Sequence, residues 1–426
     1  MRWIWRIGLG LAVVAGAAGC DDESATAVGS DLLGEGMRTV QVVFDAPAFL
    51  QGDTVYNGIG TLNEASFGVV ANDFGGELDA NLLFEVDRPI VVTYEDENED
   101  VVRDTIASIQ GGRLTVLIDS LSPQEGPVDV EVLQVTEAWD AATVSWDMRV
   151  DSAGASEPWA TPGGTTGAVL GTATWESGDS LVVALDSAAA AVWDDSAAAL
   201  MGGALRITTP GTRLRVQEVR FEFDVTPVNR DTVVTAGRVE RRATVVPEPP
   251  APAAGAVRVG GLPVWRSLLH FTPLDDLMVP CETGSTTCEI ALSEVAVSAA
   301  NLLLWTRPTG GYRAERPMRV EGRAVLEGPT VPLTRSPLSR PFSRKGDVLD
   351  PDAFATPASV LMRVPITGFV QRNANVGDGE DPLLWLALTA VGEKALFGFG
   401  EFGGVGSATA PQLELVVTIP VRKVAP

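Results

Sequence analysis

The sequence predicts an all-β protein made of two tandem antiparallel β-sandwiches, jelly-roll-like in type, each with one short helix. The chain has 426 residues, too many for a single sandwich and suitable for two. Its 44 glycines and 28 prolines separate many valine- and threonine-rich runs, as in short strands joined by turns. Five of its ten tryptophans lie between residues 128 and 207, where apolar residues alternate with polar ones in the period of two that is typical of half-buried strands.

The N-terminus has the features of an export signal. Arg2 and Arg6 precede an apolar run that is shorter than the roughly 20 residues of a spanning helix, so we expect the run to be removed after export. Residues 17–20, Ala-Ala-Gly-Cys, resemble a bacterial lipobox. This resemblance implies that Cys20 becomes the lipidated N-terminus of the mature protein. An ordinary signal peptide cleaved near Ala18 is the alternative.

The remaining chain divides by composition. We expect a signal peptide at residues 1–19, a flexible tether at 20–38, a first sandwich at 39–230 and a second at 231–426. The proline-rich segment 247–252 cannot join a sheet. It is either the linker itself or a loop after the first strand of the second sandwich.

The first sandwich is expected to open with short strands and one exposed hairpin. The strands are predicted at residues 39–44, 54–60, 66–70, 82–86 and 112–118, and the hairpin at 90–94 and 101–102. In the hairpin tip, Asp96, Asn98 and Asp100 have the spacing of calcium ligands, but no glycine follows and no bidentate glutamate stands at the later position. We therefore predict a solvated tip and no metal site.

The tryptophan-rich segment supplies the most regular patterns. Strands are predicted at 128–132 and 144–150, followed by a long connection through Pro158–Gly164. Asp186 or Ser187 can cap a helix that begins in an alanine run and ends at a glycine pair. The strand that closes this sandwich, 212–225, has one break in its alternation, between Val216 and Val219.

Several of these residues together resemble a known module. Glu137, Trp139, the run 143–146 and Trp159–Gly164 resemble the DNRLRE-type module, and residues 185–193 and 203–207 are similar to its following helix start and strand. The family comprises secreted bacterial β-sandwich domains that often stand beside cell-surface or carbohydrate-active regions. The match covers about half of the first sandwich. A weak internal repeat in the second half, without the paired tryptophans, supports two similar modules.

Reactive groups are scarce. The formal net charge of −25 argues against a nucleic-acid partner. His270 is the one histidine, and it is expected on the outward face of a strand. The sequence has no G-x-S-x-G turn, no Cys/His cluster and no glycine-rich phosphate loop. We therefore expect no enzyme activity, no cofactor and no bound metal.

The three cysteines predict one disulfide. If Cys20 carries the lipid, Cys281 and Cys288 remain as an even pair in an oxidising compartment. Their spacing, with Gly284 near its centre, lets the chain turn back far enough to bring the two Cα atoms within bonding range.

These patterns lead to a functional hypothesis. We expect an exported protein that is lipid-anchored to a bacterial membrane, facing the periplasm or the cell surface, and that binds an envelope polysaccharide or other surface polymer. Trp159 and Tyr312 stand in turn-rich segments and are the candidate ligand-binding aromatics. The alternatives are a structural or adhesion scaffold without a ligand and, more remotely, a carboxylate-based glycoside hydrolase.

One segment contrasts with the acidic whole. Between residues 307 and 345, nine basic residues face only three acidic ones. This segment can contact the other sandwich, a polyanionic envelope polymer or lipid head groups, or it can be an ordinary solvated face.

Overall fold

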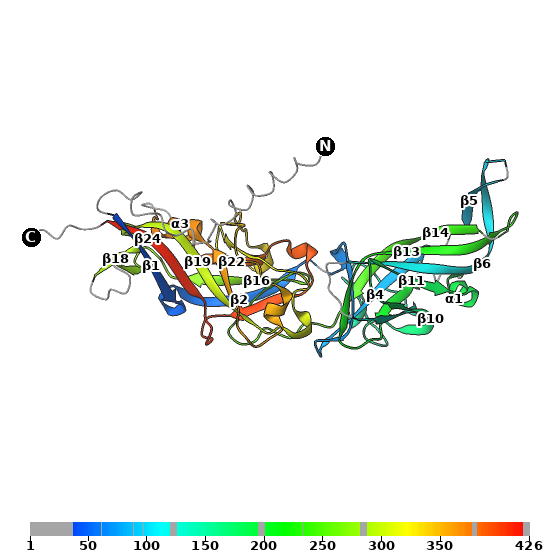
Figure 1. The fold of residues 1–426 in the computed structure, drawn as a ribbon, viewed down its shortest axis with the longest axis horizontal. Coiled ribbons are helices and arrows are strands. Elements are labelled where there is room, and N and C mark those ends of the chain that lie inside the picture. Colours follow the sequence, from blue (N-terminus) through cyan, green and yellow to red (C-terminus); the bar gives the residue numbers. More distant parts are fainter. Residues whose placement is uncertain are drawn as a thin grey trace, which may run out of the picture.

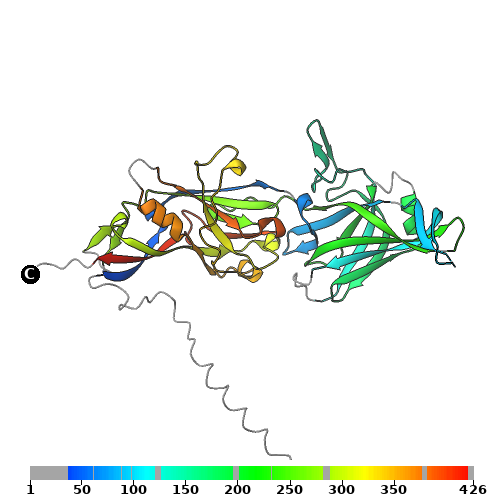
Figure 2. The ribbon, with the colours of Figure 1, turned by 90° about the horizontal axis from the view of Figure 1, so that it is seen from above.

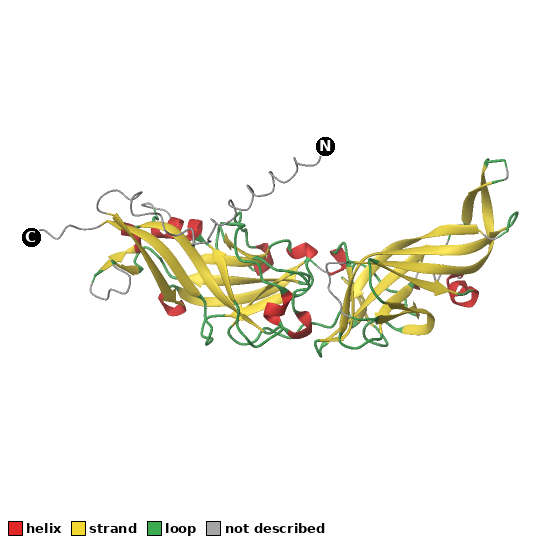
Figure 3. Cartoon of the chain, in the orientation of Figure 1, coloured by secondary structure: helices red, strands yellow, loops and turns green. Residues whose placement is uncertain are grey.

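The computed structural model describes residues 37–420, except 61, 88, 97, 120–125, 195–200, 232, 282–287 and 377–380. The described chain forms two β-rich lobes placed end to end (Figure 1), and the perpendicular view in Figure 2 shows the same elongated arrangement. Strands dominate both lobes (Figure 3), and the pairings between the strands named below are antiparallel. The predicted all-β, antiparallel class is confirmed, with one short α-helix described in each lobe.

The first lobe, which we call the terminal sandwich, combines residues 37–59 with residues 256–420. One sheet contains β1 (Met37–Asp45), β24 (Gln412–Pro420), β19 (Ala296–Arg307), β23 (Phe399–Gly403) and β15 (Ala256–Gly260), and β21 (Leu361–Pro365) pairs with β19. The facing sheet contains β2 (Leu50–Ile59), β16 (Val264–Phe271), β22 (Trp385–Ala390) and β20 (Val320–Ala324). Inward residues such as Leu269, Leu302 and Leu415 fill the space between the sheets.

Two smaller elements complete the terminal sandwich. Helix α3 (Thr367–Ala374) packs Phe369 against Phe271, with ring centroids 4.8 Å apart. The hairpin of β17 (Met278–Pro280) and β18 (Glu289–Ala291) brings Cys281 and Cys288 together, and the backbone N–H of Cys281 donates to the carbonyl of Cys288. The two residues form a disulfide with their Cα atoms 5.4 Å apart. The predicted bridge is confirmed.

The second lobe, which we call the inserted sandwich, spans residues 68–245. Its strands are β3 (Gly68–Phe74), β4 (Leu78–Asp87), β5 (Val91–Glu95), β6 (Val101–Ile118), β7 (Val128–Val135), β8 (Met148–Ser152), β9 (Ala155–Pro158), β10 (Thr166–Trp175), β11 (Ser180–Leu185), β12 (Gly203–Ile207), β13 (Thr212–Pro227) and β14 (Val233–Val245), with helix α1 (Ser187–Ala191). A single sheet runs in the order β10-β7-β12-β4-β14-β13-β6-β11 and bends around a core that includes Trp193, Phe221 and Phe223.

Short 3₁₀ helices lie in the connections of both lobes. They are η2 (Ala46–Ala48), η3 (Leu62–Glu64), η4 (Val192–Asp194), η5 (Leu292–Glu294), η6 (Gly310–Tyr312), η7 (Leu333–Arg335), η8 (Pro351–Phe354) and η9 (Glu393–Ala395). Of these, η3, η6 and η9 lie where the two sandwiches meet, and they shape the surfaces described below.

The strand pairing corrects the predicted domain order. Strand β1 pairs with β24 and β2 pairs with β16, so residues 39–59 belong to the terminal sandwich and not to a module of residues 39–230. Strand β14 pairs with β13 and β4, so residues 233–245 close the inserted sandwich and do not open a second module at 231. The two sandwiches are therefore not tandem, because one is inserted into the other after β2. Alternation in the sequence predicts that a strand exists, but it does not identify the strand's partner.

Two predictions that depend on residues close together in the chain are confirmed. Asp186 caps helix α1 by accepting the N–H of Ala189 at 2.8 Å, as predicted. The break in alternation near Val216 is a shift in register between β13 and β6 at Val216 and Glu218.

The predicted strand at 144–150 is wrong in its first half. Only residues from Met148 onward form β8. Asp140 organises a turn before it by accepting the N–H of Ala142 and the hydroxyl of Thr143. Local side-chain hydrogen bonds of this kind compete with strand pairing, so alternating residues such as Val144 become buried without joining a sheet.

The segment 247–252 is the return connection between the two sandwiches, which settles the alternative left open by the sequence. Its prolines lack N–H groups, and it joins neither sheet. Two side chains of the terminal sandwich bind its carbonyl groups instead: the hydroxyl of Tyr312 donates to Pro247 at 3.1 Å, and Arg258 donates to Pro250 at 2.8 Å. The linker is therefore held against the terminal sandwich.

The junction between the sandwiches is apolar at its centre. Phe67, which directly precedes β3, and Val69 and Leu78 of the inserted sandwich pack with Trp265 and Phe399 of the terminal sandwich. The backbones also approach closely. A Cβ atom at Gly311 would lie only 2.0 Å from the carbonyl oxygen of Phe74, so this position accepts glycine alone.

A buried group of charges lies beside this apolar contact. Arg215 of β13 is 6% exposed, lies 3.1 Å from the carboxylate of Asp119 and forms an ion pair with Glu315 of the terminal sandwich. Arg316 of the terminal sandwich reaches the same Asp119. The guanidinium of Arg215 also lies over the ring of Phe67, 3.5 Å from its centroid. Two ion pairs of this group, Arg215 with Glu315 and Arg316 with Asp119, thus cross the junction.

Burial makes these charges costly. It raises the pKa of Glu315 above its ordinary value even though Arg215 and Arg213 oppose the shift. It also lowers the pKa of Arg213 to about 10. Arg213 donates to the carbonyl groups of Gly311 and Arg313 across the junction. Because each charge is expensive to bury, removing one partner leaves the others uncompensated.

We predict that Arg215→Met destabilises the protein by about 3–5 kcal/mol, because Glu315 then remains buried without its cation. Calorimetric or denaturant unfolding of residues 21–426 measures the effect. The matched control is Arg220→Met, which removes an exposed ion pair with Glu218 and should cost less than about 1 kcal/mol. Equal, small effects of the two substitutions would contradict the buried network.

The insertion also predicts which fragments fold. Residues 254–426 alone lack β1 and β2, so β24 and β16 each lose a paired strand and the core loses Val40, Phe49 and Leu50. We expect this fragment to remain unfolded, and the same fragment joined through a flexible linker to residues 37–60 to fold. Amide dispersion in NMR spectra distinguishes the two. Both fragments expose the same junction surface, so native-like spectra of the shorter one would refute the insertion.

Candidate functional site

A cleft of about 750 Å³ lies between the outer face of the terminal sandwich and the connection from β2 to β3, and it is close to the junction because Ala395 in its lining accepts an N–H of Arg215. We call it the junction cleft; it is lined by Glu64, Ser66, Arg266, Glu321, Arg323, Arg344 and residues 389–395. Its volume falls within the roughly 300–1,000 Å³ of typical ligand sites, and such sites often lie at domain interfaces.

The cleft forms from the alternation of three neighbouring strands. Arg266 on β16, Glu321 and Arg323 on β20, and Thr389 on β22 share one face of the sheet, because the residues between them, such as Leu388, point into the core. Farther along the same face the outward residues are apolar and are covered by the segment that follows β20, including Leu333 and Leu338. The polar residues are thus concentrated at the end of the sheet nearest the inserted sandwich.

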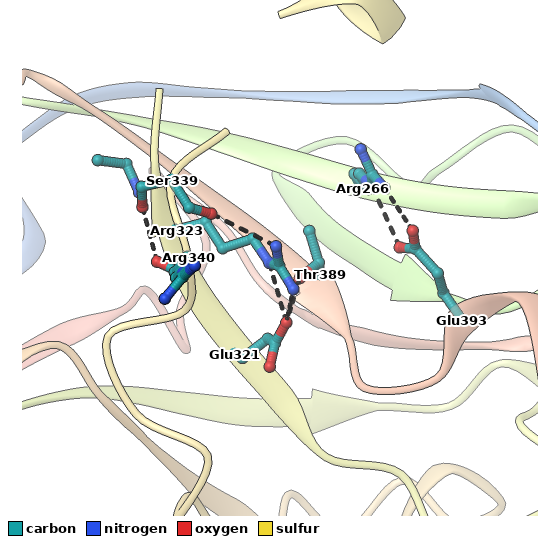
Figure 4. Close-up of polar contacts among 8 residues, drawn as sticks. Arg266, Glu321, Arg323, Ser339, Arg340, Thr389 and Glu393 are labelled. Carbon is teal, nitrogen blue, oxygen red and sulfur yellow. Dashed lines mark hydrogen bonds and ion pairs between the residues drawn. The ribbon is translucent and has the colours of Figure 1, made fainter. Parts of the chain in front are cut away.

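Two ion pairs order this surface (Figure 4). Arg266 binds both carboxylate oxygens of Glu393, with its Nε 3.1 Å from Oε2. Arg323 binds one oxygen of Glu321 through Nε, at 2.9 Å, and through its terminal nitrogen. Thr389 lies 3.5 Å from the same oxygen. Burial opposes the charge of Arg266, but the hydrogen bonds and charge of Glu393 outweigh it and raise the pKa of Arg266.

The cleft also contains two cations that belong to neither of these ion pairs. Arg344 and Lys394 are exposed, and neither has an ion-pair partner among the residues that the structure describes. The lining as a whole carries four cations, Arg266, Arg323, Arg344 and Lys394, against three acids, Glu64, Glu321 and Glu393. In a chain with a net charge of −25, this is a locally cationic surface.

The arginines of the segment 307–345 therefore lie in two different places. Arg313 and Arg316 contact the inserted sandwich: Arg313 lies 4.6 Å from the ring centroid of Phe74, and Arg316 pairs with Asp119. Arg323 and Arg344 line the junction cleft. Contact with the other sandwich, one of the interpretations open from the sequence, is confirmed for the first two arginines.

The structure does not place Trp159 on a binding surface. Its side chain is 5% exposed, packs with Trp139 and Leu83, and donates its ring N–H to the carbonyl of Ser145 at 3.1 Å. The expectation that Trp159 binds a ligand from an open loop is wrong. The proline-flanked connection folds back over an apolar face of the inserted sandwich, so the tryptophan covers that face instead of facing solvent.

Tyr312 is likewise part of the interior. It is 3% exposed, lies parallel to Phe399 at the junction and uses its hydroxyl to hold Pro247. The expectation that it binds a ligand is also wrong. Its turn-rich segment is held against the inserted sandwich, where Glu77 accepts the N–H of Gly311.

Three further predictions concern Cys20, His270 and the tip of the exposed hairpin. Cys20 lies outside the described residues. His270 faces outward on β16, as expected, and its ring stacks on that of Trp385 with centroids 4.1 Å apart. In the tip of the exposed hairpin, Asp96 accepts the N–H groups of Asn98 and Asp100, and these bonds lower its pKa. Across the described ranges, no group of three or more His, Cys, Asp or Glu side chains is arranged to hold a metal ion.

Sequence reasoning missed the junction cleft. Arg266 and Glu393 are 127 positions apart, so their pairing is not visible in the sequence. A weak local signal exists, because Arg266, Glu321 and Arg323 each place a charge inside an otherwise apolar strand. Such a charge needs a partner or a ligand.

Comparisons with known proteins give no further identification. No protein-family model matches the chain, and no curated protein matches it. Among solved structures, the N-terminal domain of the Streptococcus gordonii adhesin Sgo0707 aligns over 89% of both chains at 10% identity, with a TM-score of 0.13. A likeness at that TM-score carries no argument. Within the described ranges, no helix combines the length and apolar character that a membrane crossing requires.

The burial of Tyr312 predicts a specific pH dependence. Burial, together with the nearby charges of Glu77 and Asp79, raises the pKa of its phenol from about 10 to about 12. A raised acid pKa in the folded state contributes stability that is complete below pH 10 and is lost as the pH rises through 12. We therefore expect the parent to lose unfolding free energy relative to Tyr312→Phe between pH 10 and 12.

Denaturant unfolding of the two proteins at matched pH values tests this. At neutral pH the variant should be about 1 kcal/mol less stable, because the bond to Pro247 is gone. Parallel pH profiles would show that Tyr312 is not buried at a closed junction.

Proposed function

We propose that this chain is an exported, lipid-anchored and non-enzymatic protein of the bacterial cell envelope, and that its junction cleft binds an acidic surface polymer. The observation that carries the binding proposal is the pair of cations Arg344 and Lys394, which have no carboxylate partner among the described residues and lie beside the arginines of two ordered ion pairs in one cleft. The lipid anchor rests on the N-terminal signal and on Cys20.

The chemistry of the cleft favours a ligand that carries carboxylate or phosphodiester groups. Guanidinium and ammonium groups bind such oxyanions through charge-assisted hydrogen bonds, and a guanidinium can present two N–H groups to one oxyanion. The strongly acidic remainder of the protein repels a polyanion, so attraction is confined to the cleft and orients the polymer along it. Several weak contacts along one chain then add up to useful affinity.

The carboxylates of the cleft have a positioning role in this proposal. Glu321 and Glu393 each hold an arginine in a fixed orientation, which reduces the conformational entropy lost on binding. A glycoside hydrolase would instead use two carboxylates on the scissile bond. A structural scaffold is the other alternative, and the elongated body with a closed junction favours it.

The test uses residues 21–426 and three polymers: polygalacturonate as a polycarboxylate, poly(glycerol phosphate) as a polyphosphodiester, and dextran as a neutral control. We expect the protein to bind at least one acidic polymer. We do not expect the cleft to bind dextran. The double variant Arg344→Glu, Lys394→Glu should bind at least tenfold more weakly, which corresponds to about 1.4 kcal/mol. Calorimetric titration measures the affinity.

Arg220→Glu on the inserted sandwich is the control, because it reverses one exposed positive charge outside the cleft, and it should leave affinity within about twofold. If the parent binds neither acidic polymer, the scaffold alternative gains. If the double variant binds as well as the parent, the cleft is not the site. New reducing ends in the polygalacturonate sample would favour a hydrolase.

A further inference from the structure

A second cavity, of about 390 Å³, lies on the inserted sandwich. We call it the Trp146 pocket; its side chains include Asn72, Asp79, Asn81, Trp146, Arg206 and Thr208. It shares no lining residue with the junction cleft. Its position and its chemistry both differ from those of the cationic surface described above.

The pocket is the uncovered end of one sheet face. On β4, Asp79, Asn81 and Leu83 alternate with core residues and so point to the same outer side. The connection between β7 and β10 folds over Leu83 and buries it together with Trp139 and Trp159. The part of the sheet face that this connection covers ends at Trp146. Beyond the Trp146 ring, polar side chains of the sheet form the floor of the pocket.

The aromatic wall is held rigidly. The N–H of Gly163 donates to the carbonyl of Trp146 at 2.6 Å, and a Cβ atom at Gly163 would lie 2.8 Å from the indole ring. Gly163 also has a φ of +86°, so this close contact requires glycine. The side chain of Asn81 donates to the carbonyl of Gly163 at 2.9 Å and fixes the turn to the sheet. The ring is thus in place before any ligand binds.

Hydrogen bonds hold the polar side chains of the pocket floor in place, but several of their acceptor atoms have no donor within the described residues. Asn72 donates to the carbonyl of Thr208 at 2.9 Å, and Oδ1 of Asp79 accepts the N–H of Asp73 at 2.9 Å. Within the described residues, the amide oxygens of Asn72 and Asn81 and the Oδ2 of Asp79 have no hydrogen-bond donor. Arg206 is oriented by Glu131, with its Nε 2.7 Å from Oε1, and retains further N–H groups.

We infer that the Trp146 pocket binds one neutral sugar unit of a glycan. Adjacent hydroxyl groups of a pyranose both donate and accept hydrogen bonds, which suits the amide and carboxylate oxygens and the guanidinium of the floor. The C–H face of the ring suits the indole wall. An anionic group is disfavoured, because the charge of Arg206, the one cation among the lining residues, is balanced by Glu131 and Asp79, whereas the junction cleft has more cations than acids. The inference is independent of anion binding in the junction cleft.

The experiment titrates residues 21–426 with three neutral probes, cellotriose, laminaritriose and chitotriose, and follows binding by saturation-transfer NMR and calorimetry. We expect at least one probe to bind in the micromolar to millimolar range. Trp146→Ala should weaken binding at least tenfold and Asp79→Ala at least fivefold. Trp146→Phe keeps an aromatic wall and should retain affinity within about fivefold.

Two matched controls make the result decisive. Trp385→Ala removes a half-buried tryptophan from the terminal sandwich, and the Arg344→Glu, Lys394→Glu variant alters only the junction cleft. Both should bind the neutral probe as the parent does. The inference is overturned if no probe binds, if Asp79→Ala, whose side chain is exposed, binds as tightly as the parent, or if the cleft variant loses the neutral probe as well.

Discussion

A guanidinium group buried between two domains must be neutralised where it lies, and Arg215 sets this requirement for the whole molecule. Asp119 comes from the same sandwich, but Glu315 and the second cation on Asp119, Arg316, come from the other one. Separating the sandwiches would leave charged groups without partners beside exposed apolar surface. Burial raises the pKa of Glu315 and lowers that of Arg215, so the network is costly to form and is better explained by the specific fit of the two sandwiches than by added stability.

The fixed junction also determines the positions of the junction cleft and of the Trp146 pocket. Ala395 lines the junction cleft, and its carbonyl accepts an N–H of Arg215, so the wall of the cleft is tied directly to the buried network. The chain enters and leaves the inserted sandwich at the same end, and the proline-rich return segment is held by Tyr312 and Arg258. The cleft and the Trp146 pocket are therefore held at a constant separation.

Local physical chemistry was readable from the sequence, and long-range pairing was not. The cap at Asp186, the break in alternation at Val216 and the disulfide all depend on residues close together in the chain. The insertion depends on β1 finding β24, from Met37 to Pro420, and no pattern within a strand encodes that choice. Trp159 was assigned to an open loop because the sequence does not show that the loop folds back over an apolar sheet face.

The distance between the two sandwiches in solution shows directly whether the buried charges fix the junction. Spin labels at Val169→Cys on the inserted sandwich and Val391→Cys on the terminal sandwich occupy exposed positions, and electron–electron resonance gives the distribution of distances between them. We expect one narrow distribution for the parent background and a broad one when Arg215→Met is added. A broad or multiple distribution in the parent background would show that the buried charges do not fix the junction.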